Sequence, residues 1–257
     1  WKSREGKKKG PLTVGWGASD QQLGPELMFG TIMGELYQEH VLLIKVAWGG
    51  KSVWCDFRSP SAGEMTWDEK RVLKRDNFLK PGLYYRRLVA EIKEGLANVD
   101  ELVPGYEGQG YELCGLAWFQ GWNDFSEWHL QLDKKPVGLG LIRRYPHNLA
   151  AMFRDLRKDL GAPGLPIVIG ELGVGGLEME ERAKREDDHE AQGMMAFRRA
   201  QRAVAADESL KAVSFVPTAE FWDSRLQELR LQSDAWWNEK EKKGIKSTEE
   251  NHLPTKE

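Results

Sequence analysis

Four short apolar segments constrain the fold of this chain more than any other feature. They are rich in aliphatic and β-branched residues and span 41–47 (VLLIKVA), 113–119 (LCGLAWF), 166–172 (PIVIGEL) and 212–216 (AVSFV). Longer stretches with helical spacing of apolar residues lie between and around them. Strands that alternate with helices predict βαβ units and a parallel sheet covered on both faces. The pattern therefore predicts an α/β fold, a three-layer α/β/α sandwich.

The expected helices have recognisable periodicity and ends. In the helix predicted over 78–102, an apolar stripe is formed by Tyr84, Leu88, Ile92 and Leu96. The helix predicted over 139–160 is expected to stop at Gly161 and Pro163. No internal repeat is present. Residues 1–243 are interpreted as a single domain and 244–257 as a charged tail. The five predicted helices cover 24–37, 78–102, 139–160, 188–206 and 220–243.

Composition excludes several classes of function. The chain has 257 residues with 37 Lys and Arg against 40 Asp and Glu, a net charge of −3. This balance argues against a surface for nucleic acid or anionic membranes, which needs an excess of basic residues. No apolar run approaches the roughly 18 residues of a membrane span. Cys55 and Cys114 fit no zinc spacing and are interpreted as packing residues, so neither a metal nor a cofactor is predicted.

Three glycine-containing motifs, WGGKS, QGWND and GELGVGG, follow the predicted strands, at the sheet edge where ligands bind in open α/β folds. The first, WGGKS, ends like a phosphate-binding loop, but Lys45 stands where that loop needs its first glycine. Neither GWGASD nor GELGVGG has the spacing of a dinucleotide fingerprint. A nucleotide-binding doubly wound domain is therefore disfavoured, and these glycines are interpreted as turns.

The motif QGWND, residues 120–124, is more informative. Gln120 and Asn123 carry amide donors that can stabilise a developing oxyanion, and Gly121 permits the sharp turn that would bring them together. Gly49 and Gly50 could donate backbone N–H groups to the same oxygen. The competing interpretations are structural: Asn123 and Asp124 would cap the next segment, and the glycine pair would form an ordinary turn.

Together these motifs resemble those of the SGNH hydrolases. A Gly-x-Asn-Asp string (121–124) follows a glycine pair at an earlier strand end, and the context LLIKVAWGGKSVWCDFRSPSAG, GLAWFQGWND and VSFVPTAEFWD is similar to the sialate O-acetylesterase branch, over Leu12 to Asp223. The resemblance implies a flavodoxin-like sheet and removal of O-acetyl groups from sugars by a serine hydrolase. It implies oxyanion donation by Gly49 or Gly50 and by either Asn123 or Gln120. It also implies export to a periplasmic or extracellular location, although no signal peptide is visible.

Two family motifs are absent. No Gly-Asp-Ser or Gly-Gln-Ser-Asn block precedes the first predicted strand, and no Asp-x-x-His block follows the last one. We therefore expect an incomplete domain that lacks its first strand, its serine and its histidine. Residues 41–47 and 113–119 should then not pair and should lie about 9–10 Å apart, unless Leu12–Trp16 fills the gap. Gly49, Gly50, Gln120 and Asn123 should face that gap.

The remaining candidates concern the substrate. Ser19 and Ser52 lack the context of a nucleophile. His189 lies in a charged run that is expected to be a solvated helix face, and His252 lies in the tail, so only His129, which follows the site motif closely, is kept as a candidate. Indoles stack well on sugar rings but also fill cores. The predicted substrate-binding residues for an acetylated carbohydrate are Trp122, Asp124, Trp128 and His129. The alternative to an esterase is a non-catalytic carbohydrate-binding relative of the same fold.

Overall fold

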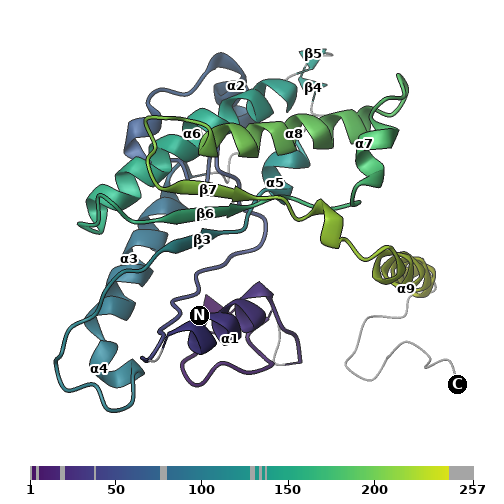
Figure 1. Ribbon diagram of the computed structural model, residues 1–257. Helices are drawn as coiled ribbons and strands as arrows, with labels where there is room; N and C mark the ends of the chain where they lie inside the picture. The colour runs from purple at the N-terminus through teal and green to yellow at the C-terminus, as the bar shows by residue number, and fades with distance from the viewer. Residues whose placement is uncertain are drawn as a thin grey trace, which may run out of the picture.

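A three-stranded parallel sheet forms the centre of the molecule (Figure 1). The computed structural model describes residues 2–3, 6–17, 21–37, 39–75, 80–127, 131–132, 135–136 and 138–242. Strand β3 (Leu116–Trp118) pairs with β6 (Ile167–Gly170), which pairs with β7 (Val213–Val216). Each strand lies within a segment predicted from its apolar run. The predicted α/β class with a parallel sheet is confirmed.

Two long helices cover one face of this sheet. Helix α6 (Gly138–Asp159) connects β3 to β6, and α8 (His189–Ala205) connects β6 to β7. Right-handed crossovers between strands added in the same direction place both helices on the same face. The core lies between these layers, where Phe153 and Phe197 are fully buried. Both helices agree with their predicted ranges to within one residue at each end.

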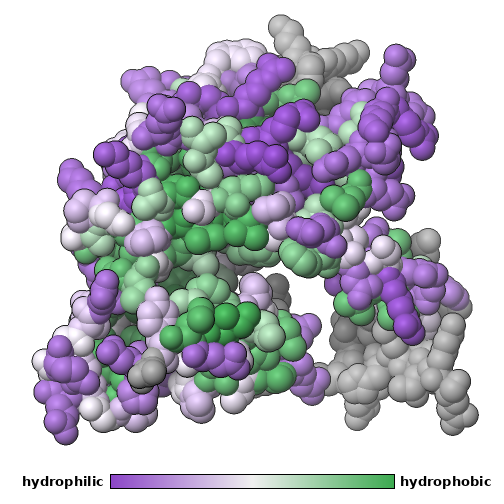
Figure 2. Space-filling view, viewed as in Figure 1, coloured by the Kyte–Doolittle hydropathy of each residue, from purple (hydrophilic) through white to green (hydrophobic). Residues whose placement is uncertain are grey.

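The other face of the sheet is more open. Val168 in β6 and Val216 in β7 are 40% and 43% exposed, whereas Ile167 and Ile169 on the covered face are buried. In Figure 1, α1 (Pro25–Leu36) is drawn below β3, and α9 (Ser224–Lys242) is drawn at the lower right, past the end of β7. Four apolar residues of α1, Met28, Phe29, Ile32 and Leu36, are exposed as well, and a green patch lies over α1 in the lower half of Figure 2. Both helices fall within their predicted ranges.

The region between 48 and 102 is more broken than its sequence indicated. The predicted helix 78–102 begins later, because residues 80–82 form a loop and turn, and it is divided into α3 (Leu83–Ala97) and α4 (Val99–Leu102); residues 78 and 79 lie outside the described part. Helix α2 (Trp67–Arg75) was not predicted. Its signal was a capping box, in which the Thr66 N–H donates to Glu69 Oε2 (2.6 Å) and the Glu69 N–H donates to Thr66 Oγ1 (3.2 Å).

The smaller elements complete the chain. Short helices α5 (Trp122–Phe125) and α7 (Glu178–Arg182) follow β3 and β6. The 3₁₀ turns are η1 (Pro60–Ala62) and η2 (Ala219–Phe221). Two-residue strands form two separate antiparallel pairs, β1 (Lys2–Ser3) with β2 (Gly6–Lys7) and β4 (Gln131–Leu132) with β5 (Lys135–Pro136). No helix within the described ranges has the length and apolarity to cross a bilayer. The predicted tail 244–257 lies outside these ranges.

The predicted strand at 41–47 is wrong, because these residues join no strand ladder. Side chains hold the segment instead. Ile44 packs toward α3 at Gly95. Lys45 forms an ion pair with Glu26 of α1 (2.7 Å) and donates a hydrogen bond to the Trp16 carbonyl (2.7 Å). An apolar β-branched sequence favours a strand only where a neighbour offers hydrogen bonds. As expected, residues 41–47 form no ladder with 113–119. The predicted separation of about 9–10 Å between these two segments stays a prediction. Leu12–Trp16 forms no strand that could fill a gap between them.

A glycine fixes how closely the chain after β3 approaches α8. A Cβ atom at Gly121 would lie 2.6 Å from Cε1 and 2.9 Å from Cζ of Phe197, a ring that is fully buried and has no room to move away. Overpacking of a core typically costs about 1–3 kcal/mol. We therefore predict that Gly121→Ala lowers the free energy of unfolding by that amount, measured by urea denaturation.

The matched control is Gly164→Ala, where an added Cβ meets nothing within 4 Å. That variant should be neutral or stabilised by up to about 1 kcal/mol, since it only restricts the unfolded chain. Equal stability losses in the two variants would contradict the packing argument.

Candidate functional site

The QGWND residues form a turn and a one-turn helix at the carboxyl end of β3. Gln120 and Gly121 make the turn, and Trp122 to Phe125 form α5. This is the sheet edge where open α/β folds bind ligands. The structure therefore places the motif as the sequence predicted, with Gly121 buried against α8.

The side-chain amide of Gln120 is fully engaged within the protein. Its Nε2 donates to the Lys51 carbonyl (3.0 Å) and to Asp124 Oδ2 (2.6 Å), and its Oε1 accepts from the Tyr145 hydroxyl (3.3 Å). A glutamine amide has only two N–H donors. Gln120 could therefore donate to a substrate oxygen only by giving up one of these bonds.

Asn123 is in the opposite situation. The side chain is half-buried, and only its backbone carbonyl takes part, as acceptor for the Ser126 hydroxyl (3.1 Å). Among the described residues, the Asn123 amide has no hydrogen-bond partner. Next to it, the Trp122 indole is 52% exposed and rests against Phe125, with ring centroids 5.5 Å apart. Of the two predicted amide donors, Asn123 is the one left available.

Asp124 is buried, with 3% of its surface exposed. Its carboxylate accepts from the backbone N–H of Val53 (3.0 Å to Oδ1 and 2.9 Å to Oδ2) and of Trp54 (3.2 Å), besides Gln120. Burial raises the pKa of Asp124 to about 7, with a smaller contribution from the Asp56 carboxylate, while the hydrogen bonds from Gln120, Val53 and Trp54 oppose the rise. The carboxylate thus joins two segments separated by 70 residues.

The predicted glycine pair begins the second of these segments. Gly49 and Gly50 are exposed, and a Cβ built on either would meet nothing within 4 Å. Gly50 has a φ of +72°, a conformation that favours glycine. The chain then turns inward, and Ser52 to Ser59 are buried. Gly49 and Gly50 are therefore open to solvent and directly precede the stretch that Asp124 binds.

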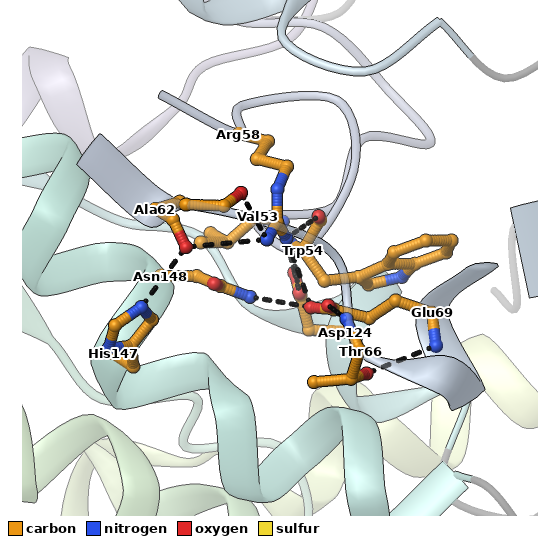
Figure 3. A network of polar contacts seen from close by, with 10 residues as sticks. Val53, Trp54, Arg58, Ala62, Thr66, Glu69, Asp124, His147 and Asn148 are labelled. Carbon is orange, nitrogen blue, oxygen red and sulfur yellow. Dashed lines mark hydrogen bonds and ion pairs between the residues drawn. The ribbon is translucent and has the colours of Figure 1, made fainter. Parts of the chain in front are cut away.

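A second polar network supports the buried stretch from behind (Figure 3). Arg58 pairs with Glu69 (3.0 Å) and donates to the Trp54 carbonyl (3.1 Å), and Asn148 of α6 donates to the same Glu69 oxygen (3.2 Å). Glu69 is fully buried, and hydrogen bonds from Thr66, Asn148 and Arg58, with the charge of Arg58, lower its pKa against the opposing effect of burial. The network fixes the loop onto α2 and α6.

Sequence reasoning missed the supporting residues on the helices. Tyr145 of α6 binds the Gln120 side chain, and Gln201 of α8 donates to the Gln120 carbonyl (3.1 Å) while accepting from the Leu172 N–H (2.8 Å). Both residues are completely buried. A polar group within the apolar stripe of a helix was the available signal, since such a group needs a partner.

Among the residues that the structure describes, no serine and histidine lie together as nucleophile and base. The Ser52 hydroxyl donates to Asp56 (3.2 Å), His147 lies 3.1 Å from the Ala62 carbonyl, and His189 stands at the start of α8. No serine–histidine hydrogen bond and no metal-binding cluster of His, Cys, Asp and Glu occurs in the ranges the structure covers. Trp128, His129, Ser19 and His252 lie outside those ranges, so the roles of Trp128 and His129 stay predictions.

The raised pKa of Asp124 predicts a pH dependence of stability. The folded protein takes up a proton on Asp124 between the ordinary value of 3.8 and about 7, where the unfolded chain is already ionised. Stability from this group therefore falls as pH rises through that window, by about 1.4 kcal/mol per pH unit at most. Urea denaturation of the wild type and Asp124→Asn at pH 5 and pH 7 should show the wild type losing stability relative to the variant. A difference that does not change with pH would contradict the assignment.

One comparison with known proteins identifies the family. A model of the family described as "Carbohydrate esterase, sialic acid-specific acetylesterase" matches residues 5–219, which is most of the chain and includes both site segments. No curated protein and no solved structure matches the chain. The match confirms the resemblance seen in the sequence motifs. The chain belongs to the carbohydrate esterase family of sialic acid-specific acetylesterases.

Proposed function

We propose that this chain provides the oxyanion-stabilising side of an esterase site that removes O-acetyl groups from sugars. Family membership supports ester hydrolysis on carbohydrates. The observation that carries the proposal further is the different state of the two amides in QGWND, since Gln120 is bound within the protein and Asn123 is not. Asn123 is accordingly assigned as the side-chain donor, together with a backbone N–H of Gly49 or Gly50.

The chemistry explains why such donors matter. Attack on an acetyl ester turns the carbonyl oxygen into an oxyanion, and donors held in place before the reaction stabilise it without reorganising. Asn123 sits on α5, whose position is fixed by Gly121 and by Asp124 at its centre. A donor on such a support meets the requirement for preorganisation.

The exposed Trp122 supports a carbohydrate as substrate. Its indole is adjacent to Asn123 and half-exposed, so its flat apolar face is available to a sugar ring. Trp122 is proposed as a stacking platform beside the acetyl group.

A nucleophile and a base complete the proposed mechanism. The family's serine and histidine blocks do not occur in residues 1–257, and the described part contains no serine paired with a histidine. We propose that both groups belong to segments other than residues 1–257. The second candidate, a carbohydrate-binding relative without hydrolytic activity, accounts for the same absence without further segments.

The first prediction is that the 257-residue chain alone does not hydrolyse acetyl esters. Triad residues act as a unit, and removal of nucleophile and base together leaves only the small rate enhancement of binding and oxyanion stabilisation. Release of p-nitrophenol from p-nitrophenyl acetate should match the buffer blank. Turnover accompanied by labelling with a fluorophosphonate would place a reactive serine within this chain and overturn the assignment.

A second prediction separates the two amides, in a protein that joins this chain to the serine and histidine segments. Asn123→Ala should lower kcat by about 10²–10³-fold, the usual effect of losing one oxyanion donor. The matched control is Asn98→Ala, which removes an asparagine that donates only to the Glu94 carbonyl at the end of α3 and should leave kcat unchanged. An unchanged kcat in Asn123→Ala would exclude Asn123. Sugar binding without turnover in the wild type would favour the binding protein.

A further inference from the structure

Two distant segments meet at the carboxyl end of β3, and side chains alone connect them. The segment 49–54 carries the glycine pair, and the segment 120–124 carries Asn123. Because 41–47 joins no ladder, no strand pairing fixes the first segment relative to β3. The connection consists of the bond from Gln120 to the Lys51 carbonyl and the bonds from the Val53 and Trp54 N–H groups to Asp124.

The Asp124 carboxylate has no capacity left for a ligand. It is buried, Oδ1 accepts from the Val53 and Trp54 N–H groups, and Oδ2 accepts from the Val53 N–H and Gln120 Nε2. A residue that contacts a sugar needs an oxygen that faces solvent. The geometry thus disagrees with the substrate-binding role that the sequence suggested for Asp124.

We propose that Asp124 is a positioning residue, whose buried carboxylate sets the spacing between the glycine pair and Asn123 and does not contact substrate. This inference rests on the proposed function, because the spacing matters only if both segments donate to one oxyanion. Asp124 is adjacent in sequence to Asn123 and binds backbone three residues beyond Gly50. Any movement of Asp124 therefore displaces the two sets of donors relative to each other.

The isosteric variant Asp124→Asn tests this role without changing side-chain volume. An asparagine has one acceptor and one donor group, and both oxygens of Asp124 receive N–H donors. Above about pH 7, where Asp124 of the wild type is ionised, the NH₂ group of the new amide faces either the Trp54 N–H or the Gln120 amide whichever way it turns, and donor opposes donor. The segment 51–54 should then move away from α5.

The control is Asp155→Asn, which removes a comparable contact outside the proposed donor pair. Asp155 is also buried and accepts from the Ser61 N–H (2.7 Å) and the Ser61 hydroxyl (2.5 Å), joining η1 to α6 across 94 residues. Both variants lose a buried carboxylate that holds a loop by its backbone. Only Asp124 lies between the glycine pair and Asn123.

Kinetics in the protein that includes the serine and histidine segments give the first measurement. Asp124→Asn should lower kcat about 10²-fold per folded molecule, the effect expected of roughly 1 Å of misplacement, with KM nearly unchanged. Asp155→Asn should lower the stability but not kcat. A raised KM with unchanged kcat would restore the substrate-binding role, and unchanged kinetics in Asp124→Asn would reduce the residue to a structural one. Either result overturns the proposal.

Amide hydrogen exchange in the 257-residue chain gives a measurement that needs no activity. Asp124→Asn should accelerate exchange at Val53 and Trp54 by at least about tenfold, whereas Asp155→Asn should accelerate it at Ser61. Unchanged exchange at 53 and 54 would refute the positioning role even if kcat fell. If the two variants show these exchange changes but the wild-type protein with the serine and histidine segments has no turnover, the proposed function is wrong and the connection through Asp124 is correct.

Discussion

A buried carboxylate determines how the two site segments of this chain are placed. Asp124 receives backbone N–H groups of Val53 and Trp54, and no strand ladder performs that task, because 41–47 is unpaired. Aromatic packing adds to it, since the Phe57 and Trp118 rings meet edge to face at 5.3 Å. Packing tolerates sliding, whereas hydrogen bonds to a carboxylate have definite directions and lengths. The precision of the arrangement therefore comes from Asp124.

This precision has a cost in stability. A carboxylate removed from water favours its neutral form, as the raised pKa of Asp124 records. The nearby Glu69 is just as buried, but it is paired with Arg58, and its pKa is lowered. Asp124 is thus ionised at an energetic cost, whereas Glu69 is well paired. Such costs are typical of functional sites, where they are retained for the geometry that they provide.

The same contacts divide the QGWND residues into supporting and available groups. Gln120 and Asp124 bind the loop and the helices behind it, through Tyr145 and Gln201. Asn123 and Trp122 remain toward the solvent side of α5. An oxyanion donor benefits from rigid neighbours that take no part in the reaction themselves. The motif thus combines a potential reacting surface with the structure that holds it.

The sequence by itself determined the parallel sheet, the helices on its covered face and the family motifs. Strand length, helical periodicity and glycine position are local properties, so β3, β6, β7, α6 and α8 appeared where predicted. Only the tertiary structure decided the state of 41–47, because a strand exists through a partner that its own residues do not specify. The contacts of Gln120, Asn123 and Asp124 were decided the same way. Their contacts lie up to 81 residues away, and which amide stays free depends on what fills the space around it.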